Sequence, residues 1–361
     1  MRIATYNVNN LFERAKVLEM EGFSKKTSSV FDDIKELNKL LKNSDYKPVN
    51  NVIVSLLEKY FLPKSNNNFF IINQIKGQLY SISKDGKDII LHAKGCKDWK
   101  GWVELIKIPV DNLAYQNTGR VINEVKPDLM CVVEVENRYA LDNFNKHVLN
   151  NHFKYNMAFD GNDTSGIELG LYSNYAITNF KSHMFETYKL NGNYHKTFNR
   201  DCAEYEITLN SNQKLYVLCN HFKSNGYGTE KENDIKRKKQ AEKVNEILKK
   251  YDLKKDFVIV SGDFNDTPDH APLQPLLSNK NIINVVDNID GSKGTYLDQD
   301  TQLDYLLVSM PLYGKLTNIG IERRGIFNNG QVKHFDTITN ESTQASDHAL
   351  IWADFNIDRC N

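Results

Sequence analysis

Short apolar segments rich in β-branched residues recur along this chain of 361 residues, and several of them end in a polar residue. The clearest is the segment 258–265, with the sequence Val-Ile-Val-Ser-Gly-Asp-Phe-Asn. Such a run predicts a buried strand that delivers Asp263 and Asn265 to its carboxyl end on one face, where both can touch one ligand. Gly, Asp and Asn are also common turn residues, so for this segment alone a turn is the simpler interpretation.

Four further apolar segments carry polar residues at an end. The polar residues at these positions are Asn7, Glu134, His221 and the adjacent pair Asp347 and His348. Each can bind a metal ion or move a proton. A carboxylate beside an imidazole at the mouth of a strand costs free energy unless both are paired or solvated. The convergence of these strand ends predicts one catalytic site.

Six motifs follow one another in the chain. They are Thr5-Tyr6-Asn7, Val133-Glu134-Val135, Asn220-His221-Phe222-Lys223-Ser224, Gly262-Asp263-Phe264-Asn265, Gln302-Leu303-Asp304-Tyr305-Leu306-Leu307-Val308-Ser309 and Ser346-Asp347-His348. In content and order they resemble the motifs of the endonuclease/exonuclease/phosphatase superfamily, which includes deoxyribonuclease I, apurinic endonucleases, inositol-polyphosphate phosphatases and sphingomyelinases. The pattern resembles most the deoxyribonuclease-like and bacterial nuclease branch.

The resemblance implies an α/β fold, a four-layer sandwich of two mixed β-sheets flanked by helices. The alternation of short strands and helices after Glu134 agrees with such a layered arrangement. Because the motifs run from one terminus to the other, we expect a single domain over residues 1–361. Residues 13–111 carry none of the motifs, and we interpret them as an inserted subregion.

The inserted subregion has its own pattern of elements. Apolar residues at helix spacing predict helical structure over residues 13–50 and a second helix over 52–61. The segments 69–72 and 88–91 bracket the turn sequence Lys-Asp-Gly-Lys at 84–87, which predicts a hairpin between them.

Hydrolysis of a phosphodiester requires a cation that neutralises the phosphate, an oriented water and stabilisation of the departing oxygen. Hard cations such as Mg²⁺ or Mn²⁺ prefer oxygen ligands. The oxygen ligands expected for such a cation are Asn7, Glu134 and Asp347. Glu136 competes with Glu134 because it lies two residues further on the same strand face. We expect Asp263 and Asn265 beside the attacked phosphorus.

The resemblance also implies roles for the two histidines. The carboxylate of Asp304 is expected to hold one ring nitrogen of His348, so that the other faces the phosphate. Without that resemblance, Asp304 is more typical of a strand-edge residue. His221 is expected to protonate or hydrogen-bond the phosphate and the leaving group. Glu168, in the strand that follows Gly166, is the candidate that orients His221.

Several residues are candidates for substrate binding. Arg200 stands where the superfamily often has an arginine, and a surface salt bridge is the alternative. Trp99 and Trp102 are predicted to stack on bases, the alternative being that they pack the insertion internally. The basic run at 236–239 is interpreted as the solvated face of a long helix. Histidines outside the motifs, such as His270, are interpreted as solvated loop residues.

The sequence favours a nuclease that acts on DNA and/or RNA. A phosphatase or a phospholipid phosphodiesterase of the same superfamily is the alternative, and a non-catalytic binding module is the second. The segment Gln302-Leu303-Asp304-Tyr305 lacks the tryptophan and arginine that flank this aspartate in inositol-polyphosphate phosphatases. A formal net charge of +0 gives no strong basic field, so contacts with nucleic acid must be local.

The N-terminal residues and the hydropathy of the chain lead to an expectation about its cellular location. The first expected strand begins at Arg2, which leaves no room for a signal peptide, and no apolar run reaches membrane-spanning length. We therefore expect a cytoplasmic enzyme without a membrane partner. The sequence leaves the oligomeric state open.

Overall fold

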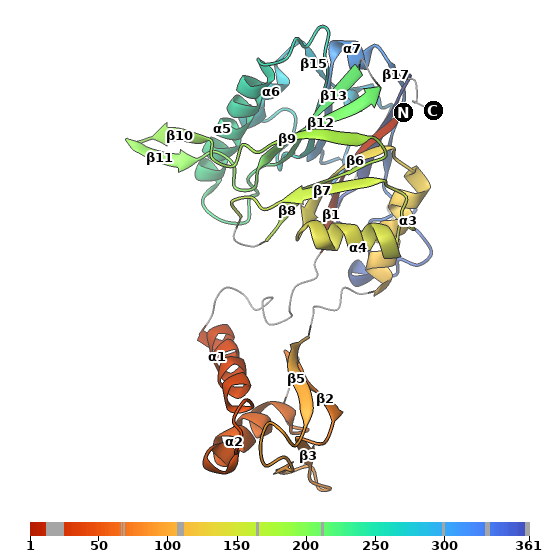
Figure 1. Cartoon of the computed structure of the whole chain (residues 1–361). Helices are drawn as coiled ribbons and strands as arrows, with labels where there is room; N and C mark the ends of the chain where they lie inside the picture. The colour runs from red at the N-terminus through yellow and green to blue at the C-terminus, as the bar shows by residue number, and fades with distance from the viewer. Residues whose placement is uncertain are drawn as a thin grey trace. The chain divides into compact units, whose positions relative to one another are not determined.

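The structure is a computed structural model that describes residues 1–11, 25–65, 67, 69–106, 112–163, 166–210, 213–297, 300–328 and 333–357. The chain divides into two compact units (Figure 1). The first unit comprises Met1–Phe12 and Val110–Asn361, and the second comprises Glu13–Pro109. No helix in the described ranges is long and apolar enough to cross a membrane.

Two six-stranded sheets form the first unit's centre. The first sheet contains, in spatial order, β17 (Leu316–Glu322), β18 (Leu350–Phe355), β1 (Arg2–Leu11), β6 (Leu129–Val135), β8 (Glu168–Ser173) and β7 (Tyr155–Phe159). The second contains β15 (Ile282–Asn284), β16 (Asp304–Ser309), β14 (Phe257–Asp263), β13 (Gln213–His221), β12 (Cys202–Asn210) and β9 (Ala176–Lys181). Both are mixed, because β1 pairs with β6 and β13 with β14 in parallel while their other neighbours are antiparallel.

Helices cover the outer faces of both sheets. Side chains of α3 (Asn112–Val125) and α4 (Arg138–His147) share an apolar core with the first sheet. Side chains of α5 (Glu230–Leu248) and α6 (Gln274–Leu277) share another with the second sheet. A third core lies between the sheets. This helix–sheet–sheet–helix order confirms the predicted four-layer α/β fold.

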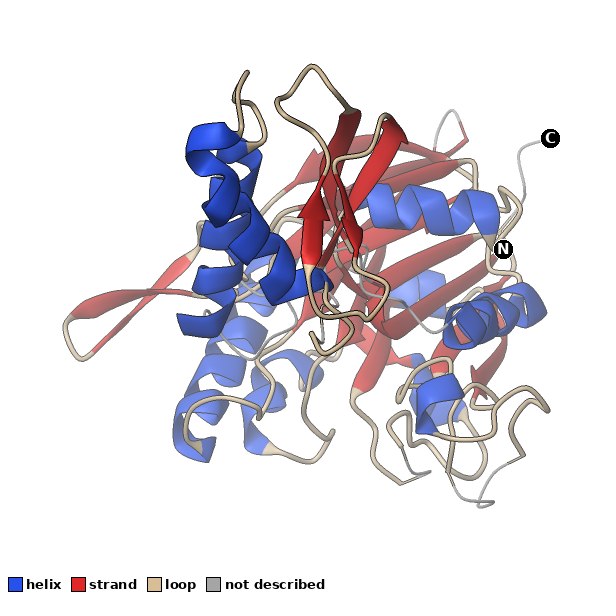
Figure 2. Cartoon of the chain, turned by 90° about the horizontal axis from the view of Figure 1, so that it is seen from below, coloured by secondary structure: helices blue, strands red, loops and turns tan. Residues whose placement is uncertain are grey.

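The shorter elements of the first unit lie in its connections. They are β10 (Thr187–Leu190), β11 (Asn193–Lys196), α7 (Met310–Tyr313), η3 (Ala271–Leu273), η4 (Val285–Asn288) and η5 (Glu341–Thr343). Strands β10 and β11 form a hairpin that projects from the rest of this unit (Figures 1 and 2).

Alternation along the central strands explains why they fit between two apolar layers. On β1, Ile3 belongs to the core between the sheets, whereas Ala4 belongs to the core under α3 and α4. On β6, Leu129 belongs to the core between the sheets, and Met130 belongs to the core under α3 and α4. Successive strand residues point to opposite faces, so both faces of these strands are apolar and buried.

The second unit has its own apolar core, which includes Leu37, Ile53, Leu57 and Phe70. Its elements are α1 (Lys25–Leu40), η2 (Lys47–Val49), α2 (Asn50–Phe61), β2 (Phe70–Lys76), β3 (Tyr80–Ile82), β4 (Ile89–Leu91) and β5 (Lys100–Leu105). The two expected helices are present as α1 and α2, while residues 13–24 of the first lie outside the described residues.

The hairpin in the second unit is formed by a different pair of strands from the pair that the sequence predicted. Strand β4 pairs with β3 across the turn at 84–87, and β2 pairs with β5. The turn was therefore identified correctly, but its first strand is 80–82 and not 69–72. Sequence pattern locates a tight turn well, whereas a short apolar run does not say which other strand it will join.

Candidate active site

Polar side chains from both sheets meet at one edge of the first unit. They are Asn7 on β1, Glu134 on β6, His221 at the end of β13, Asp263 at the end of β14, Asp304 at the start of β16 and His348 just before β18. Strands β16 and β18 run antiparallel to β14 and β1, so they begin where β14 and β1 end. In register, His221 lies opposite Asp263, and Asp263 lies opposite Asp304.

Asn7 joins the two sheets at this edge. Its side-chain Nδ2 donates to Oδ2 of Asp263 at 3.2 Å and to Oε1 of Glu134 at 3.3 Å. Its Oδ1 accepts from the backbone N of Asn9 at 3.0 Å. The amide nitrogen of Asn7 and the carboxylates of Glu134 and Asp263 therefore belong to one cluster, whereas the amide oxygen of Asn7 faces the backbone of Asn9.

His348 and Asp304 form a buried pair. Nδ1 of His348 lies 2.8 Å from Oδ2 of Asp304, and the backbone N of Asp304 donates to the Thr295 hydroxyl at 3.0 Å. Burial alone would lower the pKa of His348, but the charges of Asp304 and Asp263 and the hydrogen bond to Asp304 outweigh it and raise the pKa to about 10. A pKa in this range favours the protonated ring at neutral pH, and Nε2 of His348 lies 3.9 Å from Oδ2 of Asp263.

The pKa of His221 is shifted in the opposite direction. Its Nε2 lies 3.6 Å from Oδ2 of Asp263 and 3.8 Å from Oε1 of Glu134. Burial, followed by the positive charges of Arg200 and His348, holds the pKa of His221 well below its ordinary value. Two imidazoles whose pKa values are shifted in opposite directions thus face the same carboxylate, an arrangement suited to acid–base chemistry.

Burial raises the pKa of two carboxyl groups in the cluster, those of Asp263 and Glu134. Burial is the main cause that raises the pKa of Asp263 to about 7, with His348 opposing it and Asp304 adding to it. Burial also raises the pKa of Glu134, and the negative charge of Asp347 contributes. A bound cation would relieve this repulsion, and the carboxylate oxygens of Glu134 and Asp347 are of the kind that a hard divalent cation prefers, whereas the Asn7 amide presents its nitrogen to Glu134.

Asp263, Asp304 and His348 also bring possible metal-ligand atoms within 4.8 Å of one another. However, Nδ1 of His348 is already paired with Asp304, and a protonated ring has no free lone pair for a metal. This triad is therefore better suited to proton transfer than to metal binding.

The backbone is unusual at two site residues. Glu134 has φ of 67° and Asn265 has φ of 53°, a left-handed conformation that is uncommon outside glycine. Just before Asp263, a Cβ on Gly262 would lie 1.9 Å from the carbonyl oxygen of Asn220, so only glycine fits. The Gly-Asp-Phe-Asn motif thus combines a close approach of two strands with a turn that bends Asn265 back, where its backbone N donates to Oδ1 of Asp263 at 2.7 Å.

Sequence analysis missed three supporting residues. The hydroxyl of Ser346 donates to the backbone oxygen of Asn7 at 2.7 Å and accepts from the backbone N of His348 at 3.0 Å. Thr295 fixes the backbone of Asp304, and the ring of Tyr296 lies 4.8 Å from that of His348. Ser346 lay inside a quoted motif, but no pattern marked the loop that contains Thr295 and Tyr296.

The expected pairing of Glu168 with His221 is not formed. Oε2 of Glu168 accepts from the backbone N of Gly161 at 2.6 Å, and burial raises the pKa of this carboxyl to about 8. Nδ1 of His221 has no hydrogen-bond partner among the described residues. Glu168 begins β8 in the first sheet and is engaged by the loop before it, which accounts for the difference.

Arg200 lies close to the cluster. It is 8 % exposed, and its Nε lies 2.8 Å from Oδ2 of Asp163. Its charge contributes to the low pKa of His221 and opposes the raised pKa of Glu134. Burial at this position does not fit the alternative of a surface salt bridge, and it leaves Arg200 a candidate for holding a phosphate.

The two tryptophans differ from each other. Trp99 is 9 % exposed in the core of the second unit, and its Nε1 donates to the Tyr46 hydroxyl at 2.9 Å, so its ring is not available to stack on a base. Trp102 is 50 % exposed on β5, with its Nε1 3.3 Å from Oε2 of Glu104. The prediction for Trp99 is thus corrected to a packing role, and that for Trp102 stays a prediction.

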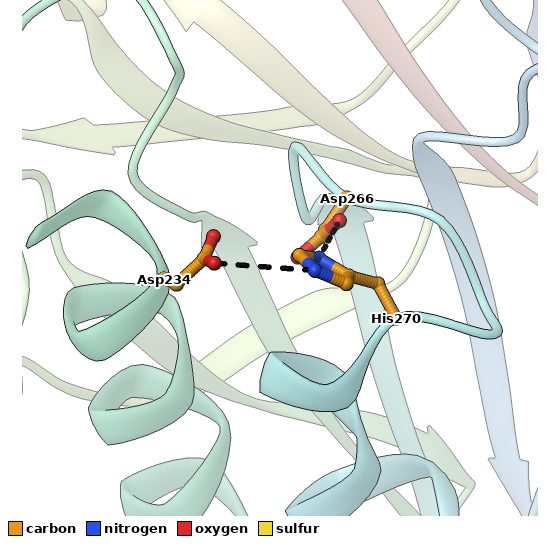
Figure 3. Close-up of side chains that lie close together, drawn as sticks. All are labelled: Asp234, Asp266 and His270. Atoms are coloured by element: carbon orange, nitrogen blue, oxygen red, sulfur yellow. Dashed lines mark hydrogen bonds and ion pairs between the residues drawn. The ribbon is translucent and has the colours of Figure 1, made fainter. Parts of the chain in front are cut away.

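A second cluster contains Asp234, Asp266 and His270 (Figure 3). His270 lies in a loop with its side chain 41% exposed, as expected, and its Nδ1 also lies 2.8 Å from Oδ1 of Asp266. Arg237, only 2 % exposed, donates to Oδ2 of Asp266 at 3.0 Å and to Oδ1 of Asp234. Its guanidinium already neutralises both carboxylates, which disfavours a cation there.

Arg237 also corrects the interpretation of the basic run at 236–239 as a solvated face. Its NH1 donates to the backbone oxygen of Lys223 at 3.1 Å and to Oδ1 of Asn225 at 2.7 Å. Arg237 therefore holds the loop that follows His221. A run of basic residues on a helix predicts an exposed face, and the sequence pattern alone does not show that one of these side chains points inward.

Comparisons with known proteins agree with this fold. A family model described as the Endonuclease/Exonuclease/phosphatase family matches residues 87–341. The fold and the match to this family model together define the class of the protein, which is that of the phosphoester hydrolases. The chain belongs to the endonuclease/exonuclease/phosphatase family, which confirms the resemblance noted in the sequence. No curated protein sequence matches the chain.

Solved structures with a similar fold have low sequence identity to this chain. The catalytic domain of human nocturnin with bound sulfate is 17% identical over 68% of this chain and 87% of that chain, with a TM-score of 0.49. A conserved protein of unknown function from Enterococcus faecalis is 14% identical over 67% of this chain and 90% of that chain, with a TM-score of 0.49. Truncated Caenorhabditis elegans TDP2 is 16% identical over 67% of this chain and 89% of that chain, with a TM-score of 0.45.

Proposed function

We propose that the chain is a metal-dependent phosphodiesterase that acts as a nuclease on DNA and/or RNA. The observation that carries the proposal is the position of Asp263, whose Oδ2 lies 3.6 Å from Nε2 of His221 and 3.9 Å from Nε2 of His348. The Asp304 carboxylate, 2.8 Å from Nδ1 of His348, raises the pKa of that ring, whereas burial lowers the pKa of His221. Family membership supports hydrolysis of a phosphoester, and the site chemistry supports the choice of a phosphodiester.

Asn7, Glu134 and Asp347 are the residues that would hold Mg²⁺ or Mn²⁺. When bound there, the cation supplies positive charge that offsets the charge of the phosphate. The rest of the reaction is assigned to the protein's own side chains.

In the proposed reaction, Asp263 orients the attacking water and accepts its proton as the new oxygen–phosphorus bond forms. Asn265 assists, because its backbone N and its Nδ2, 3.2 Å from Oδ2 of Asp263, fix the position of that carboxylate. His348 donates from Nε2 to the oxygen that departs as the opposite bond breaks, and Asp304 stabilises the cation before transfer. His221 donates a hydrogen bond from a ring N–H to a phosphate oxygen without gaining a full charge.

A panel of substrates tests this proposal. The purified protein is incubated with Mg²⁺ or Mn²⁺ and single-stranded DNA, duplex DNA, RNA, phosphomonoesters and sphingomyelin. We expect cleavage of at least one nucleic acid and none of the monoesters. Hydrolysis of only the monoesters would indicate a phosphatase, hydrolysis of only the lipid would indicate a phospholipid phosphodiesterase, and inactivity on every substrate would indicate a binding module.

A further inference from the structure

The hairpin of β10 and β11 is a separate two-stranded sheet that extends away from the two large sheets (Figures 1 and 2). Its turn consists of Asn191, with φ of 50°, and Gly192, with φ of 86°, and such positive values are typical of a tight two-residue hairpin turn. In the described part of the chain, its strands pair only with each other. An isolated hairpin of this length is marginal in water, so contacts with other elements must support it.

One face of the hairpin supplies that support. Tyr188 stacks on its cross-strand neighbour His195, with ring centroids 5.5 Å apart and planes at 24°. Lys236 of α5 lies 5.5 Å above the Tyr188 ring, and its ammonium donates to the backbone oxygen of Lys196. The hairpin is therefore held to α5 through this face.

The opposite face is exposed and combines rings with ammonium groups. We call the set Phe185, Lys189, Tyr194 and Lys196 the aromatic–lysine face. Lys189 and Tyr194 are opposite each other in register, so their side chains share one face, and Nζ of Lys189 lies 5.9 Å from the Tyr194 ring. Nζ of Lys196 lies 4.6 Å from the ring of Phe185, which precedes β10. Phe185 is 75% exposed and Tyr194 is 76% exposed.

The aromatic–lysine face is connected to the candidate active site. Nζ of Lys196 donates to Oδ1 of Asn162 at 3.2 Å, and the backbone N of Asn162 donates to the backbone oxygen of Arg200 at 3.4 Å. Arg200 is the buried cation whose charge acts on Glu134 and His221. Hydrogen bonds therefore link Lys196 on the hairpin, through Asn162, to the backbone of Arg200.

We propose that the aromatic–lysine face binds a single strand of nucleic acid and directs it toward the site. Exposed rings stack on bases of any identity, and lysines beside them attract the phosphates. In a duplex the bases are already stacked on one another, so this face favours single strands. The hairpin tip consists of Asn191, Gly192 and Asn193, and these residues lack the apolar side chains that would insert into a lipid surface.

Binding is tested by fluorescence anisotropy with a labelled single-stranded 20-mer, its duplex and phosphatidylserine-containing vesicles, in EDTA so that no cleavage occurs. Phe185→Ser and Tyr194→Ser should each weaken single-strand binding by roughly 10-fold. Lys189→Gln and Lys196→Gln should each reduce the slope of log K against log salt by about 0.7. Tyr139→Ser, an exposed tyrosine of α4 that is 63% exposed in the wild type, is the matched control and should bind as the wild type does.

The inference rests on the proposed nuclease function, but the two can fail separately. Hydrolysis of bis(4-nitrophenyl) phosphate reports on the site, because this substrate is too short to reach the hairpin. Wild-type hydrolysis together with unchanged single-strand binding by Phe185→Ser and Tyr194→Ser would overturn the inference and leave the function intact. Equal losses for single strand and duplex, or a loss seen only with vesicles, would also overturn it. A selective loss for the single strand supports it even if no substrate is cleaved.

Discussion

Nδ1 of His348 lies 2.8 Å from Oδ2 of Asp304, and both side chains are buried. The two residues are 44 positions apart in the chain and come from the starts of strands in different sheets. The pair fixes which ring nitrogen of His348 points toward Asp263. The acid–base chemistry of the site depends on this orientation.

Replacing Asp304 by Asn should therefore lower kcat by roughly 10²-fold or more, because the amide favours the wrong tautomer of His348 and removes the charge that stabilises the imidazolium. Metal titrations should give the same half-saturating concentration as the wild type. A variant with normal kcat at high metal concentration and a much larger metal requirement would show instead that Asp304 is a metal ligand.

The pH dependence of kcat/KM follows from the two perturbed groups. Asp263 must be ionised to accept a proton, so activity should rise with pH through about 7, and His348 must be protonated, so activity should fall as pH rises through about 10. In Asp304→Asn, the falling limb should move to lower pH, because the main positive contribution to the pKa of His348 is lost. A falling limb that does not move would contradict the assignment of His348.

Chelation should abolish activity. With EDTA in excess, turnover should cease, and Mg²⁺ or Mn²⁺ should restore it. Glu134→Gln should raise the metal concentration required, since it removes a charged oxygen ligand, while Glu136→Gln serves as the matched control two residues away. Full turnover in excess chelator, or a larger effect of Glu136→Gln than of Glu134→Gln, would refute the ligand set.

Arg237 should be important for stability. Arg237→Met leaves Asp234 and Asp266 without their buried cation, and removing one partner of a buried pair costs about 3–5 kcal/mol of unfolding free energy. Urea denaturation followed by circular dichroism measures this cost. Lys238→Met, at the exposed neighbouring position of α5, should change the free energy of unfolding by less than about 0.5 kcal/mol. Equal effects of both substitutions would mean that the Arg237 network does not stabilise the fold.

The central strands and their polar ends were predictable from the sequence. A strand that is buried on both faces has an apolar sequence, so a polar residue at its end is easy to recognise. Asn7, Glu134, His221 and Asp263 were identified in this way. The link between Asp304 and His348 came from the resemblance, since nothing in an apolar strand shows which distant group its carboxylate meets.

Other features were beyond the reach of sequence pattern. Trp99 and Arg237 have buried environments that depend on partners from other segments, namely Tyr46 for the indole and Asp266 for the guanidinium. Glu168 stands at a strand end as the site residues do, but the loop at Gly161 engages its carboxylate. Position along a strand predicts where a side chain emerges and not which neighbour it contacts.

The most direct test of the account is the rate of phosphodiester cleavage by His348→Ala at saturating Mg²⁺ on the nucleic acid that the wild type cleaves. Circular dichroism establishes that the variant is folded, and Tyr139→Ser serves as a control on the same unit. We predict a fall in kcat of roughly 10²-fold or more, the scale of one lost proton-transfer group. A folded His348→Ala protein with nearly normal kcat would contradict it.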